Sequence, residues 1–350
     1  MLSLGVLVDE GAKLRNLLQR ASRIAIVHHW DTDGLCAAAL LIRLLKPRGV
    51  EIIRVIPRIG SYDVEAIDLE KLMDSDLVLV LDYGIRCRDL VALKAKCRVP
   101  IVVVDHHANE ICSEVEVFAN PRAYGVQELD APSTTYVLSQ MLNTEMNDLV
   151  ALSIVGDLST FIEQSSWCRA VRDTLAQHIG YPLRFVYRIV RMVDVCYQYV
   201  DDPRCFDIAV QDLVKGVEFV LRDGYLAKLR KEVDKELYEA FKEALENVKD
   251  LGFIKVTEAS SRSYIVSHIG RKLADVFQDS IVVHIHRVEV MNKSFIYVRS
   301  HRYNLAHVLG KLKAAGMIVG GKDKVFVVTC SDKSCNEVEA VIKELKNIIA

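Results

Sequence analysis

Short apolar runs alternate with helical patterns along roughly the first 160 residues of the chain. Valine-, isoleucine- and leucine-rich runs predict buried strands at 23–29, 50–57, 76–82 and 99–105. Helical patterns are present at 34–46, 88–97, 131–142 and 147–158. Strands that are apolar throughout are typical of a parallel sheet with both faces covered by helices. The pattern therefore predicts an α/β fold with such a sheet.

The rest of the chain changes character twice. Beyond about residue 160 the pattern becomes mostly helical and increasingly charged, which predicts a helical connector. Strand patterns return at 253–259, 263–270, 280–290, 294–300 and 324–330. Helical patterns interleave with them at 305–316 and 335–349. We therefore expect three parts: a sheet domain at 1–180, a helical connector at 181–252 and a smaller α/β domain at 253–350.

Composition narrows the class of protein. Of the 350 residues, 51% are hydrophobic and 26% are charged, which is enough to fill more than one core and excludes disorder over most of the chain. The formal net charge is −2. This balance argues against a protein that coats DNA nonspecifically, because such proteins carry a strong basic excess.

Cysteine usage and hydropathy predict where the protein resides. The chain has nine cysteines, and several lie inside apolar runs, as Cys36 does. None forms a CxxC pair, so we expect reduced, mostly buried thiols. Asp9 and Glu10 interrupt the first apolar stretch, so we expect no signal peptide. No uncharged apolar segment is long enough to span a bilayer. We therefore expect a soluble, cytoplasmic protein without a membrane partner.

Side chains that bind metal ions follow three of the predicted strands. His29, Asp31 and Asp33 occupy alternate positions, so in an extended segment they point the same way. Asp82 ends another strand, and an Asp-His-His run at 105–107 ends a third. The carboxyl ends of parallel strands meet at one edge of a sheet, so these side chains are expected to converge. Convergent buried carboxylates are costly unless a cation lies between them.

The ligand chemistry predicts the kind of metal. Asp157, in a Gly-Asp pair, is a further candidate ligand. A single Asp after a strand is usually a turn or cap residue, but the whole combination on one sheet favours a metal site. Carboxylates and imidazoles without a thiolate suit Mn²⁺ or a similar divalent ion. There are enough ligands for two ions, and two ions about 4 Å apart suit displacement at phosphorus.

These motifs resemble those of a known family. His-x-Asp-x-Asp-Gly at 29–34, a strand-end Asp, Asp-His-His and Gly-Asp together resemble the DHH phosphoesterase superfamily. That family includes RecJ-type single-strand exonucleases, nanoRNA and pAp phosphatases, and manganese pyrophosphatases. The resemblance covers about the first 160 residues. It implies the family's parallel-sheet domain followed by its smaller substrate-binding domain.

The resemblance implies six metal ligands around two ions. They are His29, Asp31, Asp33, Asp82, His106 and Asp157. His29 and Asp31 are implied to bind one ion and Asp33 the other, while Asp82 bridges the two. His106 and Asp157 are also implied to bind the second ion.

The resemblance assigns roles to the rest of the Asp-His-His run. Asp105 is implied to orient His106, since imidazole ligands commonly need a carboxylate partner. His107 is implied to lie near the scissile phosphate. Asp82 and His107 are therefore the implied catalytic residues.

The distal segment 296–328 resembles the family's substrate-binding domain, with a strand ending in Arg-Ser, a helix and a glycine turn. Gly320, Gly321 and Lys322 stand where many members carry Gly-Gly-Gly-His. Glycines let a backbone approach an anion, and lysine can act as a point charge for phosphate. Arg299 and Arg302 are further candidates for binding phosphate.

Two smaller patterns leave alternatives open. Trp30 and Tyr83 adjoin ligand positions, and each can either stack on a base or pack against the sheet. His284 and His286 alternate on a predicted strand, a pattern that favours half-exposed strand residues over metal ligands.

The leading hypothesis is a two-metal, Mn²⁺-type exonuclease that hydrolyses single-stranded DNA or RNA in replication or repair, with Mg²⁺ or Co²⁺ as alternative metals. One alternative is a phosphatase of small substrates such as nanoRNA, pAp or pyrophosphate. Another is a catalytically weak replisome scaffold associated with GINS and the replicative helicase. The altered glycine turn favours the scaffold, whereas the intact ligand set opposes it.

Overall fold

The computed structural model describes residues 2–178, 180, 182–330 and 335–347. The chain forms two compact units. The first comprises Met1–Tyr197 and Pro203–Ala227, and the second comprises Gln198–Asp202 and Lys228–Ala350. Every helix in the described ranges is too short or too polar to cross a lipid bilayer.

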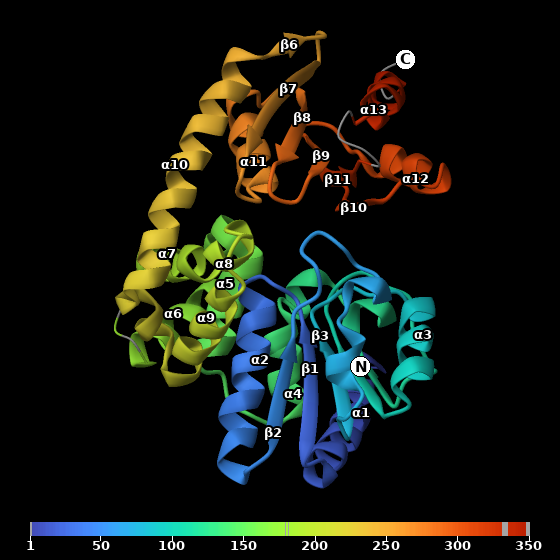
Figure 1. Ribbon diagram of the computed structural model, residues 1–350, viewed down its shortest axis with the longest axis vertical. Helices are drawn as coiled ribbons and strands as arrows, with labels where there is room; N and C mark the ends of the chain where they lie inside the picture. The colour runs from blue at the N-terminus through green and yellow to red at the C-terminus, as the bar shows by residue number, and fades with distance from the viewer. Residues whose placement is uncertain (1, 179, 181, 331–334, 348–350) are drawn as a thin grey trace. The chain divides into compact units, whose positions relative to one another are not determined.

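A five-stranded sheet lies at the centre of the first unit (Figure 1). Its strands are β1 (Arg23–His28), β2 (Glu51–Val55), β3 (Leu77–Leu81), β4 (Ile101–Val104) and β5 (Val117–Ala119). They follow the order β2-β1-β3-β4-β5, and all four pairings are parallel. Every residue of β3 and β4 is buried, which explains their unbroken apolar runs. The predicted parallel sheet is confirmed.

Helices cover both faces of this sheet. Those nearest the strands are α1 (Leu2–Arg20), α2 (Thr32–Leu45), α3 (Cys87–Cys97), α4 (Thr134–Met141) and α5 (Asp148–Leu158). The β1–α2–β2 and β3–α3–β4 crossovers run in opposite directions along the sheet. Because such crossovers are right-handed, α2 and α3 lie on opposite faces. The winding therefore reverses between β1 and β3, and functional groups gather beyond the strands at such a switch point.

The strand register brings the predicted ligands to one level. His28 of β1 pairs with Leu81 of β3, which in turn pairs with Val104 of β4. The next residues along the three strands are the predicted site residues His29, Asp82 and Asp105. Four further helices follow in the chain: α6 (Trp167–His178), α7 (Leu183–Val193), α8 (Val195–Gln198) and α9 (Arg204–Lys215).

The second unit contains a mixed sheet in the order β10-β11-β9-β8-β7-β6. Its strands are β6 (Lys249–Asp250), β7 (Ile254–Ser261), β8 (Ile281–Val288), β9 (Lys293–Arg299), β10 (Val319–Lys322) and β11 (Val325–Thr329). Its helices are α10 (Gly224–Glu246), which begins in the first unit and enters the second at Lys228, α11 (Val266–Val276), α12 (Ala306–Ala314) and α13 (Glu337–Lys346). Among the described strands of this second sheet, only β7 and β8 pair in parallel, and α11 connects them. A second α/β fold was expected here and is present.

Two local predictions in the second unit are wrong. The segment 263–270 was expected to be a strand, but it enters α11, whose buried residues Val266, Ile269 and Leu273 recur at helical spacing. The expected glycine turn is also wrong, because Gly320 and Gly321 lie in β10. Gly321 pairs with Phe326 of β11, and a Cβ on Gly321 would lie 2.4 Å from the Phe326 Cα. The chain instead reverses at residues 323–324.

His284 and His286 are fully buried, so the expectation of half-exposed strand residues is wrong. The Thr257 hydroxyl lies 2.9 Å from His284 Nδ1, and His284 Nε2 lies 3.0 Å from His286 Nδ1. His286 Nε2 then lies 2.8 Å from the hydroxyl of Ser261. Buried polar groups need such partners, and this chain of contacts joins β7 to β8 through the core of the unit.

The cysteine prediction is wrong for six of the nine residues. The structure pairs them as disulfides, Cys87–Cys112, Cys196–Cys205 and Cys330–Cys335. Cys36, Cys97 and Cys168 are free thiols. Sequence spacing did not reveal these pairs because each depends on where the backbone folds back.

Candidate metal centre

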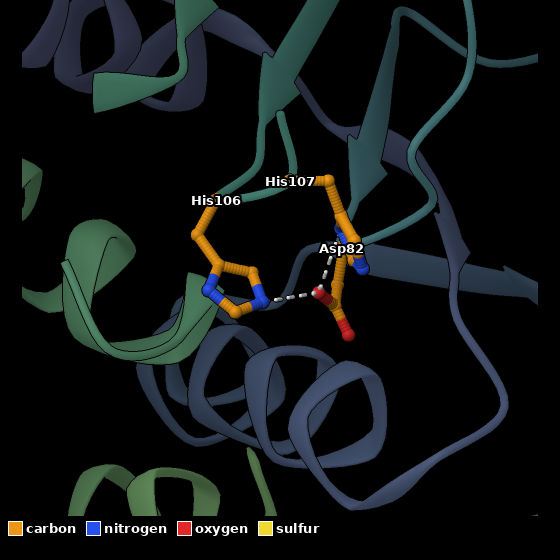
Figure 2. A group of neighbouring side chains, drawn as sticks. All are labelled: Asp82, His106 and His107. Carbon is orange, nitrogen blue, oxygen red and sulfur yellow. Dashed lines mark ion pairs between the residues drawn. The ribbon is translucent and has the colours of Figure 1, made fainter. Parts of the chain in front are cut away.

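Asp82 lies at the middle of a cluster of imidazoles and carboxylates beyond the ends of β1, β3 and β4. Figure 2 shows its carboxylate facing His106 and His107, which follow β4. His106 Nε2 lies 3.6 Å from Asp82 Oδ1, and His107 Nδ1 lies 3.7 Å from the same oxygen. His29 Nδ1 approaches the other oxygen, Oδ2, to 3.7 Å. Asp82 thus contacts imidazoles from two different strand ends.

The predicted ligands form two groups that are consistent with two ions. Ligand atoms of His29, Asp31 and Asp82 lie within 4.8 Å of one another, and so do those of Asp33, His106 and Asp157. A third such group contains Asp82, His106 and His107. All six residues assigned as ligands are therefore brought together, and Asp82 belongs to groups on both sides.

Asp31 lies in the short connection between β1 and α2, directly before the first residue of the helix. Its carboxylate caps α2 and accepts a hydrogen bond from the backbone N–H of Gly34 at 3.1 Å. A Cβ on Gly34 would lie 2.4 Å from the carbonyl oxygen of His29, so no side chain fits at this position. His29 Nδ1 lies 2.8 Å from Asp31 Oδ2. Burial raises the pKa of Asp31, but the nearby imidazole outweighs it, so the pKa is lowered overall.

The first turn of α4 holds two of the carboxylates. The backbone N–H groups of Thr134 and Thr135 donate to Asp33 at 2.6 and 2.9 Å. The Thr135 hydroxyl donates to Asp33 Oδ1 at 2.5 Å, and the Thr134 hydroxyl donates to Asp82 Oδ1 at 2.9 Å. Amide groups at a helix N-terminus favour negative charge. The sequence predicted a helix start here but not this contact with the candidate site.

Asp157 reaches the cluster through the packing of two helices. A Cβ on Gly156 would lie 3.0 Å from the Cβ of Thr32, so the glycine lets α5 approach the start of α2. Asp157 Oδ2 lies 3.3 Å from His106 Nε2. The Gly-Asp pair is therefore explained by close packing as well as by ligand chemistry.

Asp105 fixes the loop that carries both histidines. It accepts hydrogen bonds from the backbone N–H groups of His106 at 2.7 Å and His107 at 2.9 Å. Its other oxygen accepts from the N–H of Gly84 at 2.7 Å. His107 Nδ1 lies 2.7 Å from Asp105 Oδ1, so this carboxylate contacts the His107 ring. Burial raises the pKa of Asp105, but the His107 ring and the backbone donors lower it by more.

Asp82 is electrostatically unfavourable as a lone carboxylate. Burial raises its pKa well above the usual range, and the carboxylates of Asp33 and Asp31 raise it further. Its backbone is left-handed, with φ 61°, a conformation that costs free energy for residues other than glycine. The fold therefore holds Asp82 in place despite both costs.

The donor set fits divalent cations. His29 and Asp82 are 7% and 1% exposed. Within the described part of the chain, His29 Nε2 and Asp82 Oδ2 have no hydrogen-bond partner. Buried polar atoms in this condition are rare and require an explanation such as an ion. Divalent cations held among these groups would remove the repulsion between the carboxylates and would coordinate the unsatisfied atoms.

Comparison with known proteins agrees with this geometry. Residues 23–158 match the DHH family, N-terminal domain. The single-stranded-DNA-specific exonuclease RecJ of Salmonella typhimurium is 24% identical over 160 residues, which is 44% of this chain and 26% of that protein. Residues 23–158 of the chain therefore form a DHH-family domain.

Solved structures share the fold of this chain. RecJ of Thermus thermophilus in complex with Mn²⁺ gives a TM-score of 0.68 at 19% identity, over 97% of this chain and 54% of that one. The DHH domain of a member of the s1p family of ribosomal proteins gives 0.70 at 19% identity, over 99% and 92%. The chain thus spans about half of the Thermus RecJ chain and matches about a quarter of the Salmonella protein.

The predicted phosphate-binding residues lie in the second unit of the chain. Val325 of β11 pairs with Arg299 of β9 on one side and with Lys322 of β10 on the other. The basic residues Arg299 and Lys322 are thus at the same end of this sheet. The guanidinium of Arg302 lies over the ring of Tyr303, 5.6 Å from its centroid, and so makes a cation–π contact.

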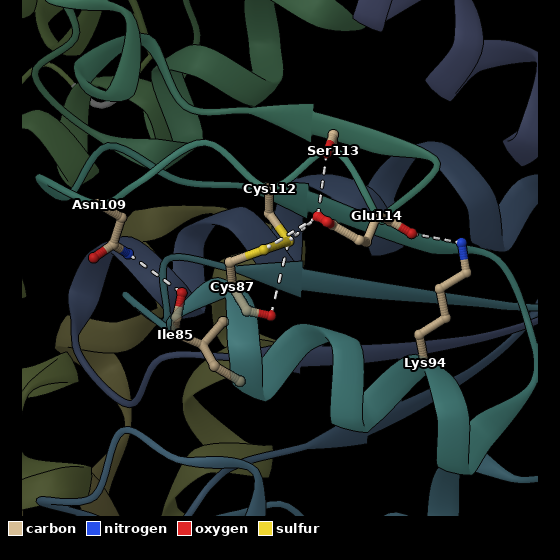
Figure 3. Close-up of a disulfide and its surroundings, with 7 residues drawn as sticks. All are labelled: Ile85, Cys87, Lys94, Asn109, Cys112, Ser113 and Glu114. Carbon is tan, nitrogen blue, oxygen red and sulfur yellow. Dashed lines mark hydrogen bonds between the residues drawn. A yellow bond between two sulfur atoms is a disulfide. The ribbon is translucent and has the colours of Figure 1, made fainter.

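A disulfide joins two of the loops that carry site residues. Cys87 lies five residues after Asp82, and Cys112 lies five residues after His107. Figure 3 shows this disulfide and a second contact between the same loops, in which the Asn109 side chain donates to the carbonyl of Ile85 at 3.4 Å. The covalent bond therefore restrains the segment after β3 against the segment after β4.

The two aromatic residues that adjoin the ligands pack against the sheet. Trp30 is 3% exposed and Tyr83 is fully buried, so neither ring face is accessible to a ligand. Of the two interpretations left open by the sequence, packing is the one that the structure supports.

Proposed function

We propose that this protein is a divalent-metal-dependent phosphoesterase that removes nucleotides from an end of single-stranded DNA or RNA. The proposal rests on the convergence at Asp82 of imidazoles and carboxylates from four separate segments. The single-stranded-DNA specificity in the name of the Salmonella relative supports the substrate class. Mn²⁺ is the proposed metal, with Mg²⁺ or Co²⁺ as alternatives, and the Thermus RecJ structure with Mn²⁺ supports that choice.

The proposed ligands would hold two ions, and Asp82 lies close to ligands assigned to each of them. His29 and Asp31 are assigned to one ion, and Asp33, His106 and Asp157 to the other. Bound there, divalent ions lower the pKa of a water molecule and neutralise the charge on phosphoryl oxygens.

The other residues position the ligands or the substrate. Thr134 and Thr135 orient Asp82 and Asp33 by hydrogen bonds. Asp105 holds His107 through Nδ1, so we assign Nε2 of that ring to hydrogen bonding with the phosphate. The side chain of His107 is 40% exposed, which gives a substrate access to the ring. Contacts to further phosphates are assigned to Arg299, Arg302, Gly320, Gly321 and Lys322 of the second unit.

The test is a metal-replacement assay on the full chain. Protein stripped with EDTA is supplied with Mn²⁺, Mg²⁺ or Co²⁺ and given 5′- or 3′-labelled single strands, the matching duplex and a labelled dinucleotide. We expect stepwise shortening of the single strand only when metal is present. Asp82→Ala should abolish it, whereas Asp68→Asn, a change at the exposed Asp68–Lys71 ion pair, should not.

Three outcomes contradict parts of this proposal. Hydrolysis of the dinucleotide alone would make the protein a small-substrate phosphatase. Unchanged turnover in Asp82→Ala would remove the mechanism. Purified protein that binds no metal and cleaves nothing would favour the scaffold interpretation.

A further inference from the structure

Tyr62 presents an exposed aromatic ring beside the candidate metal centre. It lies beyond the carboxyl end of β2, the strand that pairs with β1. The side chain is 48% exposed. Its ring centroid lies 6.0 Å from that of His29, with the two planes 27° apart. A half-exposed aromatic ring therefore adjoins one of the proposed metal ligands.

Tyr62 packs against two buried aromatic rings. Its centroid lies 5.4 Å from that of Trp30 and 6.0 Å from that of Tyr83, whose plane is inclined by 24°. Tyr62 is stacked on Tyr83 and tilted by 52° against Trp30, and of these three rings Tyr62 is the one that is substantially exposed. Such offset arrangements are favourable for aromatic pairs.

The backbone on each side of Tyr62 is held by one hydroxyl group. Tyr83 Oη lies 3.0 Å from the carbonyl oxygen of Ser61 and 3.1 Å from that of Asp63, and donates to these acceptors. The Asp63 carboxylate in turn caps the next helical turn by accepting from the N–H of Ala66 at 2.9 Å. These hydrogen bonds therefore hold the backbone on both sides of Tyr62 before any ligand binds, which reduces the entropy lost on binding.

We propose that Tyr62 stacks on the unpaired base of the nucleotide whose phosphate is hydrolysed. This inference rests on the proposed function and specifies its substrate class as a phosphoester that carries a base. Because the Tyr62 and His29 rings are only 6.0 Å apart, a nucleotide stacked on Tyr62 has its phosphate within reach of the ligand cluster. Every base has a π-face, so the contact tolerates any sequence.

The proposal separates substrate classes. Pyrophosphate and polyphosphate have no ring to stack, so they gain nothing from Tyr62. A base inside a duplex is stacked between its neighbours and must be released first. Tyr62 therefore favours single strands and dinucleotides over both of those classes.

The test compares a normal oligonucleotide with one whose terminal nucleotide lacks its base, prepared for each end in turn. We expect Tyr62→Ala to lower kcat/KM on the normal strand by roughly 5- to 150-fold, and to have little effect on the abasic strand. Tyr62→Phe keeps the ring and should retain activity within about twofold. Tyr238→Ala removes a tyrosine that is 70% exposed in α10 and is the matched control.

A binding measurement makes the result independent of turnover. Fluorescence anisotropy of a labelled single strand is measured with Asp82→Asn protein, with and without Tyr62→Ala. We expect the second change to weaken binding of the normal strand by a similar factor and to leave the abasic strand unaffected.

The possible failures are distinguishable. Equal losses on normal and abasic strands overturn the stacking role of Tyr62 alone, as does full activity and binding in Tyr62→Ala. If the wild-type protein neither cleaves nor binds any oligonucleotide, the proposed function and this inference fail together.

Discussion

The hydroxyl of Thr134 donates a hydrogen bond to Asp82 Oδ1 at 2.9 Å, across 52 positions of the chain. It connects the first turn of α4 to the residue directly after β3. Asp82 is 1% exposed, so its carboxylate is oriented by neighbouring protein groups and not by solvent. Thr134 is therefore a positioning residue for the proposed bridging ligand.

Replacing Thr134 by valine should lower Mn²⁺ affinity or activity by about 10- to 100-fold, because partners of metal ligands typically contribute that much. Valine keeps the shape of the side chain but removes the donor. Thr134→Ser keeps the donor and should retain most of the activity. Titrating activity against Mn²⁺ checks this, and equal metal dependence in wild type and Thr134→Val would contradict the positioning role.

Divalent metal should stabilise the fold, since it binds a site that exists only in the folded state. At a free concentration about 100 times its Kd, an ion adds about 2.7 kcal/mol to the free energy of unfolding. Thermal unfolding of EDTA-treated protein with and without Mn²⁺ measures the effect. Asp82→Asn should abolish most of the increase without destabilising the metal-free protein, because it removes a buried charge among carboxylates. A full Mn²⁺ response in that variant argues against Asp82 as a ligand.

Gly34→Ala should destabilise the first unit and reduce activity. The added Cβ would lie 2.4 Å from the carbonyl oxygen of His29, so the strand end or α2 must shift. Gly310→Ala is the matched control, since nothing lies within 4 Å of its added Cβ within α12. There, alanine should stabilise the helix by up to about 1 kcal/mol. Urea unfolding of both variants checks the contrast, and equal effects would show that the strand-to-helix turn tolerates a side chain.

Stability should fall as the pH is lowered below about 6.5 because of the two buried histidines in the second unit. Burial lowers the pKa of His286 to about 4, and it lowers that of His284 well below its usual value. Between those values and 6.5 the unfolded chain binds protons that the folded chain does not, so stability rises with pH in this window. Each group contributes up to about 1.4 kcal/mol per pH unit.

Urea unfolding at pH 7, 6 and 5 tests this pH dependence. His286→Gln should flatten the dependence relative to wild type, whereas His301→Gln, at a partly exposed histidine paired with Asp275, should leave it unchanged. An identical slope in His286→Gln and wild type would contradict the assignment.

Reduction of Cys87–Cys112 should loosen the two ligand-bearing loops. The bond spans 25 positions, and removing a cross-link of that size costs roughly 3–4 kcal/mol in the chain-entropy description. Cys112→Ser should therefore lower the unfolding temperature and weaken Mn²⁺ binding. Cys168→Ser changes a free thiol and is the control. Thermal unfolding with and without a dithiol reductant measures the effect, and a reductant-insensitive Cys112 variant with wild-type stability would contradict it.

Much of the candidate site could be predicted from sequence because its chemistry is local. His29, Asp31 and Asp33 occupy alternate positions at the end of an apolar run, and the Asp-His-His run ends another. Apolar runs report burial on both faces of a parallel sheet, and parallel strands have their carboxyl ends at one edge. Types of ligand, their placement at strand ends and the parallel sheet therefore follow from patterns within short segments.

The tertiary structure alone decided which distant groups meet. Thr134 and Thr135 reach Asp82 and Asp33 only because α4 packs beside the switch point. Cysteine pairing, burial of Trp30 and Tyr83, exposure of Tyr62 and the placement of Gly321 against Phe326 likewise depend on contacts between separate segments. Sequence periodicity records which face of an element is buried. It does not record which neighbour covers that face, because this is determined by the packing of the whole unit.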